Sequence, residues 1–130
     1  MTAIEDSLAV CAQRAGDIVP AVYRRFFALE PDALDLMGHS DQGMRGRMFE
    51  SALNLLLDET PFEDGCYFDW ELGNHFQSYR VLPAMYATFF EATRDCVRDA
   101  LAGDWSARHE AAWNARVHMI LERVRMRAPT

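Results

Sequence analysis

The chain has 130 residues, half of them hydrophobic, and 13 basic against 20 acidic residues give it a formal net charge of −7. This size suits a single domain, residues 1–130, and leaves no room for a second catalytic domain. The basic residues form no stripe that could follow a phosphate backbone, so we expect no nucleic acid partner. No apolar run reaches the roughly 18 residues needed to span a bilayer, and the acidic start MTAIEDSLAV is unlike a secretory leader. We therefore expect a cytoplasmic protein with no membrane contact.

Common catalytic signatures are missing from the sequence. The three cysteines Cys11, Cys66 and Cys96 are widely spaced and form no CxxC pair, so neither a disulfide framework nor a zinc knuckle is indicated. The chain contains no GxxxxGK[ST], GxGxxG, GxSxG or HExxH motif. Phosphate-loop, dinucleotide and zinc-protease chemistry therefore lack their usual residues.

Apolar residues recur at helical spacing from end to end, and no convincing period-two strand is present. Thr2 and Glu5 form a potential capping box, Asp17 is a good cap for a second helix, and Pro31 and Pro83 can open helices. We predict helices over about residues 3–15, 18–29, 31–37, 44–58, 67–78, 83–102 and 106–124. The predicted fold is all-α, with helices too unequal for a simple four-helix bundle.

Three stretches lie in the order and at the intervals found in the globin family. They are VYRRFFALEPDALDLM, LGNHFQSYRVLPAMYATFF and GDWSARHEAAW. In this set the chain resembles short single-domain bacterial globins over nearly its whole length. The resemblance implies a globin fold of six to eight helices around a central apolar pocket, with haem b as the cofactor.

The resemblance also assigns residues to the two sides of the haem. Tyr23 occupies the place of a distal tyrosine whose hydroxyl donates to bound dioxygen, although a core tyrosine is an equally plausible interpretation. Met44 and Met48 resemble the two distal-helix positions over the porphyrin, where methionine supplies soft apolar walls, and Arg45 could reach a propionate. The remaining walls would come from Leu72, Phe76, Val81 and Tyr86.

Two positions depart from the family pattern. Six residues after Pro31, where the family has a phenylalanine stacked on the porphyrin, this chain has Met37. At the proximal ligand position an ungapped comparison places Phe76, and His75 precedes it by one residue. One residue on an α-helix is a rotation of about 100°, so both side chains cannot point at one iron.

The stripe Phe68, Leu72, Phe76 and Tyr79 favours Phe76 facing inward. A bulge in the helix, or a one-residue adjustment after Ser78, would turn His75 to the iron instead. His75 is therefore either the metal ligand or a partly exposed incidental residue.

These residues lead to two functional hypotheses. The first is a haem protein that reversibly binds a diatomic gas, dioxygen or nitric oxide, for storage, sensing or scavenging. A variant of it has Met44 or His39 as a second iron ligand. The alternative is a haem-free binding or signalling module whose pocket is filled by Phe76, Met37, Met44 and Met48.

The resemblance also bears on catalysis and assembly. Nitric oxide dioxygenase activity is not expected, because such relatives carry a fused flavin reductase and a supporting glutamate where this chain has Ala128. The last two long helices offer a surface for a homodimer, by analogy with other globins.

Overall fold

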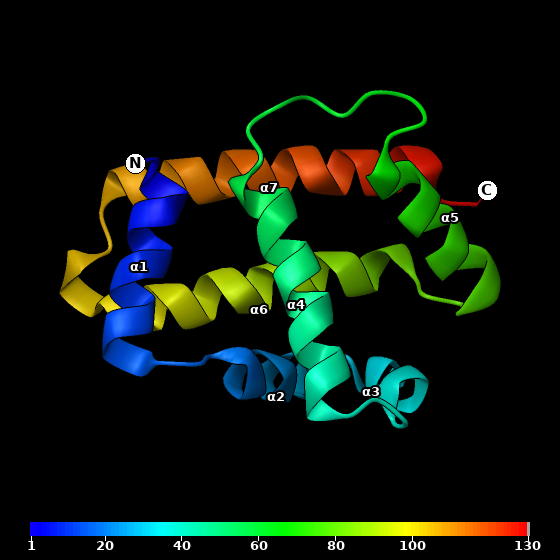
Figure 1. The fold of residues 1–130 in the computed structure, drawn as a ribbon, viewed down its shortest axis with the longest axis horizontal. Coiled ribbons are helices and arrows are strands. Elements are labelled where there is room, and N and C mark those ends of the chain that lie inside the picture. Colours follow the sequence, from blue (N-terminus) through cyan, green and yellow to red (C-terminus); the bar gives the residue numbers. More distant parts are fainter. Residues whose placement is uncertain (130) are drawn as a thin grey trace.

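The computed structural model describes residues 1–129, and the described residues contain α-helices and no β-strand. Short loops and one long connection join the helices (Figure 1). The α-helices are α1 (Ala3–Ala15), α2 (Val19–Leu29), α3 (Pro31–Met37), α4 (Gln42–Leu57), α5 (Tyr67–Ser78), α6 (Pro83–Leu101) and α7 (Ala107–Arg127), and a short 3-10 helix, η1 (Ala102–Asp104), follows α6. The all-α prediction is confirmed, and the helices lie close to their predicted bounds.

Polar side chains begin several of these helices, as the sequence predicts. The Thr2 hydroxyl accepts a hydrogen bond from the Glu5 amide at 3.1 Å. Asp17 lies one residue outside the position expected of a cap, and its carboxylate accepts from the Val19 amide at 2.9 Å. Ser106 begins α7 and forms a capping box with His109, in which an imidazole takes the place usually held by Glu or Gln.

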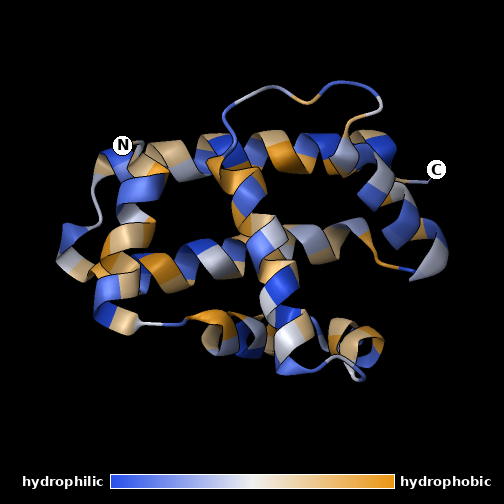
Figure 2. Ribbon diagram, viewed as in Figure 1, coloured by the Kyte–Doolittle hydropathy of each residue, from blue (hydrophilic) through white to orange (hydrophobic). Residues whose placement is uncertain are grey.

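The long helices α6 and α7 pack side by side, α1 packs against both, and α4 crosses in front of them (Figure 1). Their contact surfaces bury a large apolar cluster that includes Leu56, Phe90, Val97, Trp113 and Ile120. The hydropathy colouring shows apolar residues alternating with polar ones along the helices, whereas the connection between α4 and α5 is mostly hydrophilic (Figure 2). This pattern is that of amphipathic helices around a shared core.

A second buried cluster joins α2 to the middle of the molecule. Tyr23 and Phe26 of α2 pack against Phe89 of α6, with ring centroids 5.5 Å and 5.3 Å from it. Phe49 of α4 adds a third ring to Phe89, at 6.4 Å. These aromatic contacts hold α2 and α4 to α6 at the end of the molecule away from Trp113.

Helix α5 is attached to α7 by an ion pair. The Arg123 guanidinium donates two hydrogen bonds to the Asp69 carboxylate, at 2.7 and 2.5 Å, and both side chains are more than nine-tenths buried. Arg127 donates to the same carboxylate at 2.5 Å. Because these donors favour the ionised form, the Asp69 pKa lies well below its ordinary value.

No helix within residues 1–129 is both long enough and apolar enough to cross a bilayer.

We expect Asp69→Asn to lower the free energy of unfolding by about 3 kcal/mol, because it leaves a buried guanidinium without its counter-charge. Asp64 bonds the same two arginines but its side chain is 89% exposed, so the matched control Asp64→Asn should cost less than about 1 kcal/mol. Urea titrations of the three proteins at neutral pH test this. Equal losses in the two variants would contradict it.

The depressed Asp69 pKa also predicts a pH dependence. Stability from this carboxylate is complete above the unfolded-state pKa of about 3.9 and is lost as pH falls toward the lower folded-state pKa. Between about pH 4 and pH 2 the Asp69→Asn variant should therefore lose less stability than the parent protein.

Candidate functional site

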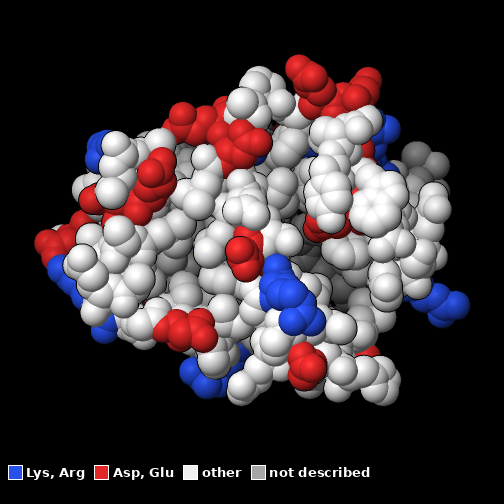
Figure 3. Space-filling model, viewed as in Figure 1, with Lys and Arg blue, Asp and Glu red and all other residues white. Residues whose placement is uncertain are grey.

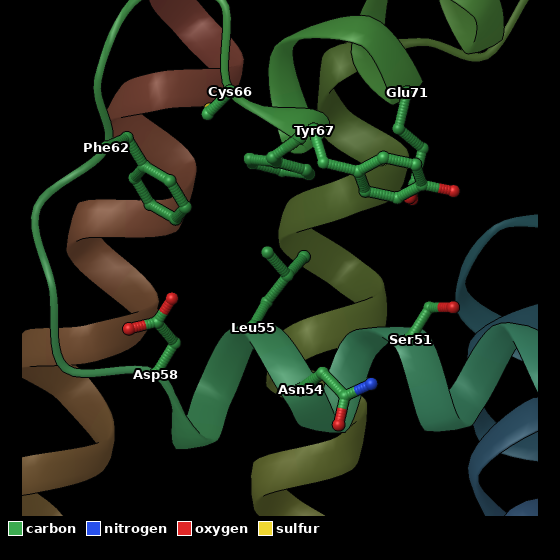
Figure 4. Close-up of a pocket in the computed structure, with 9 residues that line it drawn as sticks. Ser51, Asn54, Leu55, Asp58, Phe62, Cys66, Tyr67 and Glu71 are labelled. Atoms are coloured by element: carbon green, nitrogen blue, oxygen red, sulfur yellow. The ribbon is translucent and has the colours of Figure 1, made fainter.

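A pocket of about 260 Å³ lies between α4 and α5. Both helices pack on α7, and the molecular surface is recessed between them (Figure 3). Figure 4 shows Leu55 and Asp58 projecting from the end of α4 and Phe62 from the connecting loop, with Tyr67 and Glu71 extending from α5. The lining residues are Ser51, Asn54, Leu55, Asp58, Phe62, Cys66, Tyr67, Phe68 and Glu71.

His75 is held by a hydrogen bond between its Nδ1 atom and the Tyr86 hydroxyl of α6. The imidazole is half-buried, and this burial lowers the His75 pKa below its ordinary value of 6.5. The neutral form is therefore favoured at pH 7. Among residues 1–129, Nδ1 is the only ring nitrogen of His75 that makes a hydrogen bond, and in the tautomer whose Nδ1 donates it the Nε2 lone pair is free to bind a metal.

Phe76 contacts the same tyrosine. Its ring meets Tyr86 edge-on at 6.1 Å, while the His75 ring lies 5.9 Å from Tyr86. Helix α5 is a regular α-helix from Tyr67 to Ser78, so the bulge considered for this segment is absent from it. Phe76 is half-buried against the larger core cluster, in agreement with the apolar stripe that predicts it to face inward.

The corner after α5 turns at a strained residue. Arg80 has φ = 57°, in the left-handed region that non-glycine residues rarely adopt. With this turn the Val81 amide reaches back to the His75 carbonyl at 3.1 Å. The corner thereby ties the end of α5 to the segment that leads into Tyr86.

On the other side of the molecule, Tyr23 and Arg45 form one group. The buried Tyr23 hydroxyl donates to the Arg45 carbonyl at 3.3 Å, and burial raises the Tyr23 pKa to about 12, which keeps the phenol protonated. The Arg45 guanidinium lies over the Phe27 ring at 4.9 Å and donates to the Ser40 hydroxyl at 2.9 Å. Arg45 is thus already engaged with its own protein, and reaching a propionate would require it to leave these partners.

The other predicted residues differ in burial. Leu72 is fully buried in the larger cluster, and Met37 and Val81 pack partly buried against the smaller one. Met44 and Met48 are 45% and 38% exposed on α4. None of the ten predicted site residues lines the pocket between α4 and α5.

The side chains of this region suit haem chemically, but the pocket beside them is small for a porphyrin. His75 offers the neutral, oriented imidazole that a haem iron takes as its protein ligand. The 260 Å³ pocket lies just below the roughly 300–1,000 Å³ of pockets for drug-sized ligands, and a porphyrin is no smaller than such a ligand. The gap between α4 and α5 would have to widen before His75 could face a porphyrin within it.

Glu71 and Phe62 are two of the pocket residues that the sequence does not single out. Glu71 is half-buried, and desolvation raises its pKa. Its place four residues before His75, one helical turn away, is a signal that could have indicated it. Phe62 lies in a connection with no periodicity, so nothing in the sequence indicates which way its ring points.

Comparisons of this chain with protein-family models, curated proteins and solved structures found no match.

The burial of His75 predicts its titration. Its imidazole carbon-bound proton signals, assigned by comparison with His75→Gln, should titrate with a midpoint below 6.5. A group with a depressed folded-state pKa stabilises the protein above its unfolded-state pKa and loses that contribution as pH falls through the folded-state pKa. The stability of the parent protein relative to His75→Gln should therefore fall below about pH 6.5. A midpoint at or above 6.5 would refute the burial argument.

Proposed function

We propose that this protein is a globin-like haem protein that binds a diatomic gas, with His75 as the iron ligand. The observation that carries the proposal is the hydrogen bond between His75 Nδ1 and the Tyr86 hydroxyl. In the tautomer in which Nδ1 donates this bond, the Nε2 lone pair is free to bind iron. A metal-binding histidine is usually oriented in this way by a partner on its other ring nitrogen. Haem, when bound, would supply an iron with one position open to dioxygen or nitric oxide.

The order of the helices supports the same proposal. The resemblance assigns α4 to the distal side of the porphyrin and α5 to the proximal side, and a pocket lies between these two helices. On α4, Met44 and Met48 are exposed, so they do not refill a closed core. A porphyrin against α4 would cover these two thioether side chains and gain the free energy of burying them.

Tyr23 would set the polarity on the distal side. It is a protonated phenol whose hydroxyl now donates to the Arg45 carbonyl. A rotation of the hydroxyl would let it donate to a polar ligand, and the Arg45 carbonyl would then lose a hydrogen bond. This competition would weaken gas retention relative to a tyrosine with no other acceptor.

The haem-free module remains the alternative, and two observations favour it. Phe76 packs on Tyr86 beside His75, and it stands at the position where the family comparison expects the proximal ligand. The pocket between α4 and α5 is narrow and contains two carboxylates, Asp58 and Glu71. In that case the cavity would serve a smaller ligand or none.

Haem titration of the purified protein separates the two proposals. We expect an intense Soret band that is lost in His75→Ala, kept in Phe76→Ala, and restored to His75→Ala by added imidazole. His118→Ala is the matched control, because His118 is an exposed histidine of α7, and it should bind haem as the parent does. Absence of a Soret band in the folded parent protein would establish the haem-free interpretation.

Removing the Tyr86 hydroxyl tests the orienting role. Tyr86→Phe should weaken haem affinity by roughly 10–100-fold, as is typical when the hydrogen-bond partner of a metal ligand is lost. Dissociation rates measured by transfer of haem to an excess of a haem-scavenging protein give this ratio. Unchanged dissociation, in a variant as stable as the parent, would show that Tyr86 does not position the ligand.

A further inference from the structure

The pocket between α4 and α5 combines aromatic walls with acidic groups. Phe62, Tyr67 and Phe68 contribute the rings, and Phe62 and Phe68 lie 5.3 Å apart. Asp58 and Glu71 contribute the carboxylates, and no basic side chain belongs to the lining. Aromatic faces and carboxylates both attract cations, so the side chains that line the pocket favour a cationic ligand.

Glu71 is the pocket carboxylate that has no partner among residues 1–129. Its side chain is half-buried, and in the described part of the chain its carboxylate accepts no hydrogen bond and forms no ion pair. Partial loss of hydration disfavours the ionised carboxylate and raises the Glu71 pKa. A cation placed beside it would offset that loss.

Asp58 lies across the pocket from α5 and is differently placed. It follows the last turn of α4, is exposed, and uses Oδ1 to accept from the Thr60 amide at 2.9 Å and hydroxyl at 2.7 Å. Acidic side chains also gather on the nearby edge of the molecule, over the connection between α4 and α5 (Figure 3). Together with the net charge of −7, this arrangement favours the approach of a positively charged ligand.

The ring of Phe62, one wall of the pocket, already contacts a cation of the protein itself. The buried Arg116 guanidinium lies 4.7 Å from the centre of the Phe62 ring and also donates to the Leu55 carbonyl at 2.8 Å and the Thr60 carbonyl at 2.9 Å. These bonds fix the end of α4 and the loop that carries Phe62. The wall is therefore held in place before any ligand arrives, which lowers the cost of binding.

We propose that the pocket between α4 and α5 is a binding site for a small organic ammonium ion with an apolar body, held by Glu71 and by the aromatic walls. The volume of 260 Å³ suits a ligand of about the size of an arylalkylamine. The ammonium group would pair with the Glu71 carboxylate while the apolar body packs against the contacting rings of Phe62 and Phe68. Asp58 would contribute attraction at longer range.

Three probes of nearly equal shape test the proposal on haem-free protein: 2-phenylethylamine, 2-phenylethanol and phenylacetate. Titrations followed by backbone amide NMR should show saturable binding of the amine with shifts in α4 and α5. The alcohol should bind at least about tenfold more weakly, and phenylacetate should not bind detectably. Equal affinity of amine and alcohol would overturn the proposal, as would absence of amine binding.

Variants then assign the binding to Glu71. Glu71→Gln should weaken amine binding at least about tenfold, whereas Glu63→Gln, which removes the same charge from an exposed loop position outside the pocket lining, should not. Equal weakening of amine binding in the two variants would show that only the net charge matters, and it would overturn the proposed site. If Glu71→Gln fails to fold, Asp58→Asn serves instead and should weaken amine binding about twofold to threefold. Because no haem is present, the outcome is independent of the haem proposal.

Discussion

The rotation of α5 about its own axis is the constraint on which the candidate site depends. Two polar contacts fix it: Asp69 bonds Arg123 of α7, and His75 bonds Tyr86 of α6. The two residues are six positions apart, which places them about 240° apart around the helix and on different faces. A rotation of α5 by one residue would break both contacts at once and would take the Asp69 carboxylate away from the buried Arg123 guanidinium. The two contacts together therefore allow one orientation of α5.

That orientation brings both His75 and Phe76 to Tyr86, one through a hydrogen bond and the other through an edge-on ring contact. The sequence presents these two residues as exclusive alternatives, because only one of them can point at a given atom. The tyrosine is large enough to receive both, its hydroxyl meeting the imidazole and its ring meeting the phenyl group. Phe76 therefore does not displace His75, and an inward-facing aromatic is compatible with an oriented imidazole beside it.

The sequence predicts the helices well because their signals are local. The Thr2 cap, the Asp17 carboxylate just before α2, the breaks at Pro31 and Pro83, and the apolar spacing each act within one or two turns. It predicts the site less well because burial there depends on distant partners. Met44 and Met48 have core spacing yet are exposed, because the burial of a helical stripe depends on which other helix packs against it. The sequence indicates that Arg45 is an unpaired cation on α4. Its stacking on Phe27 could not be predicted, because it depends on how α2 packs against α4.

The charges around the gap bear on both proposed occupants. The pocket contains the carboxylates of Asp58 and Glu71, which disfavour the propionate edge of a porphyrin and favour an ammonium group. The other end of α4 carries Arg45 and Arg47 in its first two turns, next to the positive end of the helix dipole. Arg45 is occupied by Phe27 and Ser40, which leaves Arg47 as the exposed cation there. An anionic edge would thus be more stable near Arg47 and a cation more stable beside Glu71, so the two proposed ligands are favoured by charges at different parts of α4 and α5.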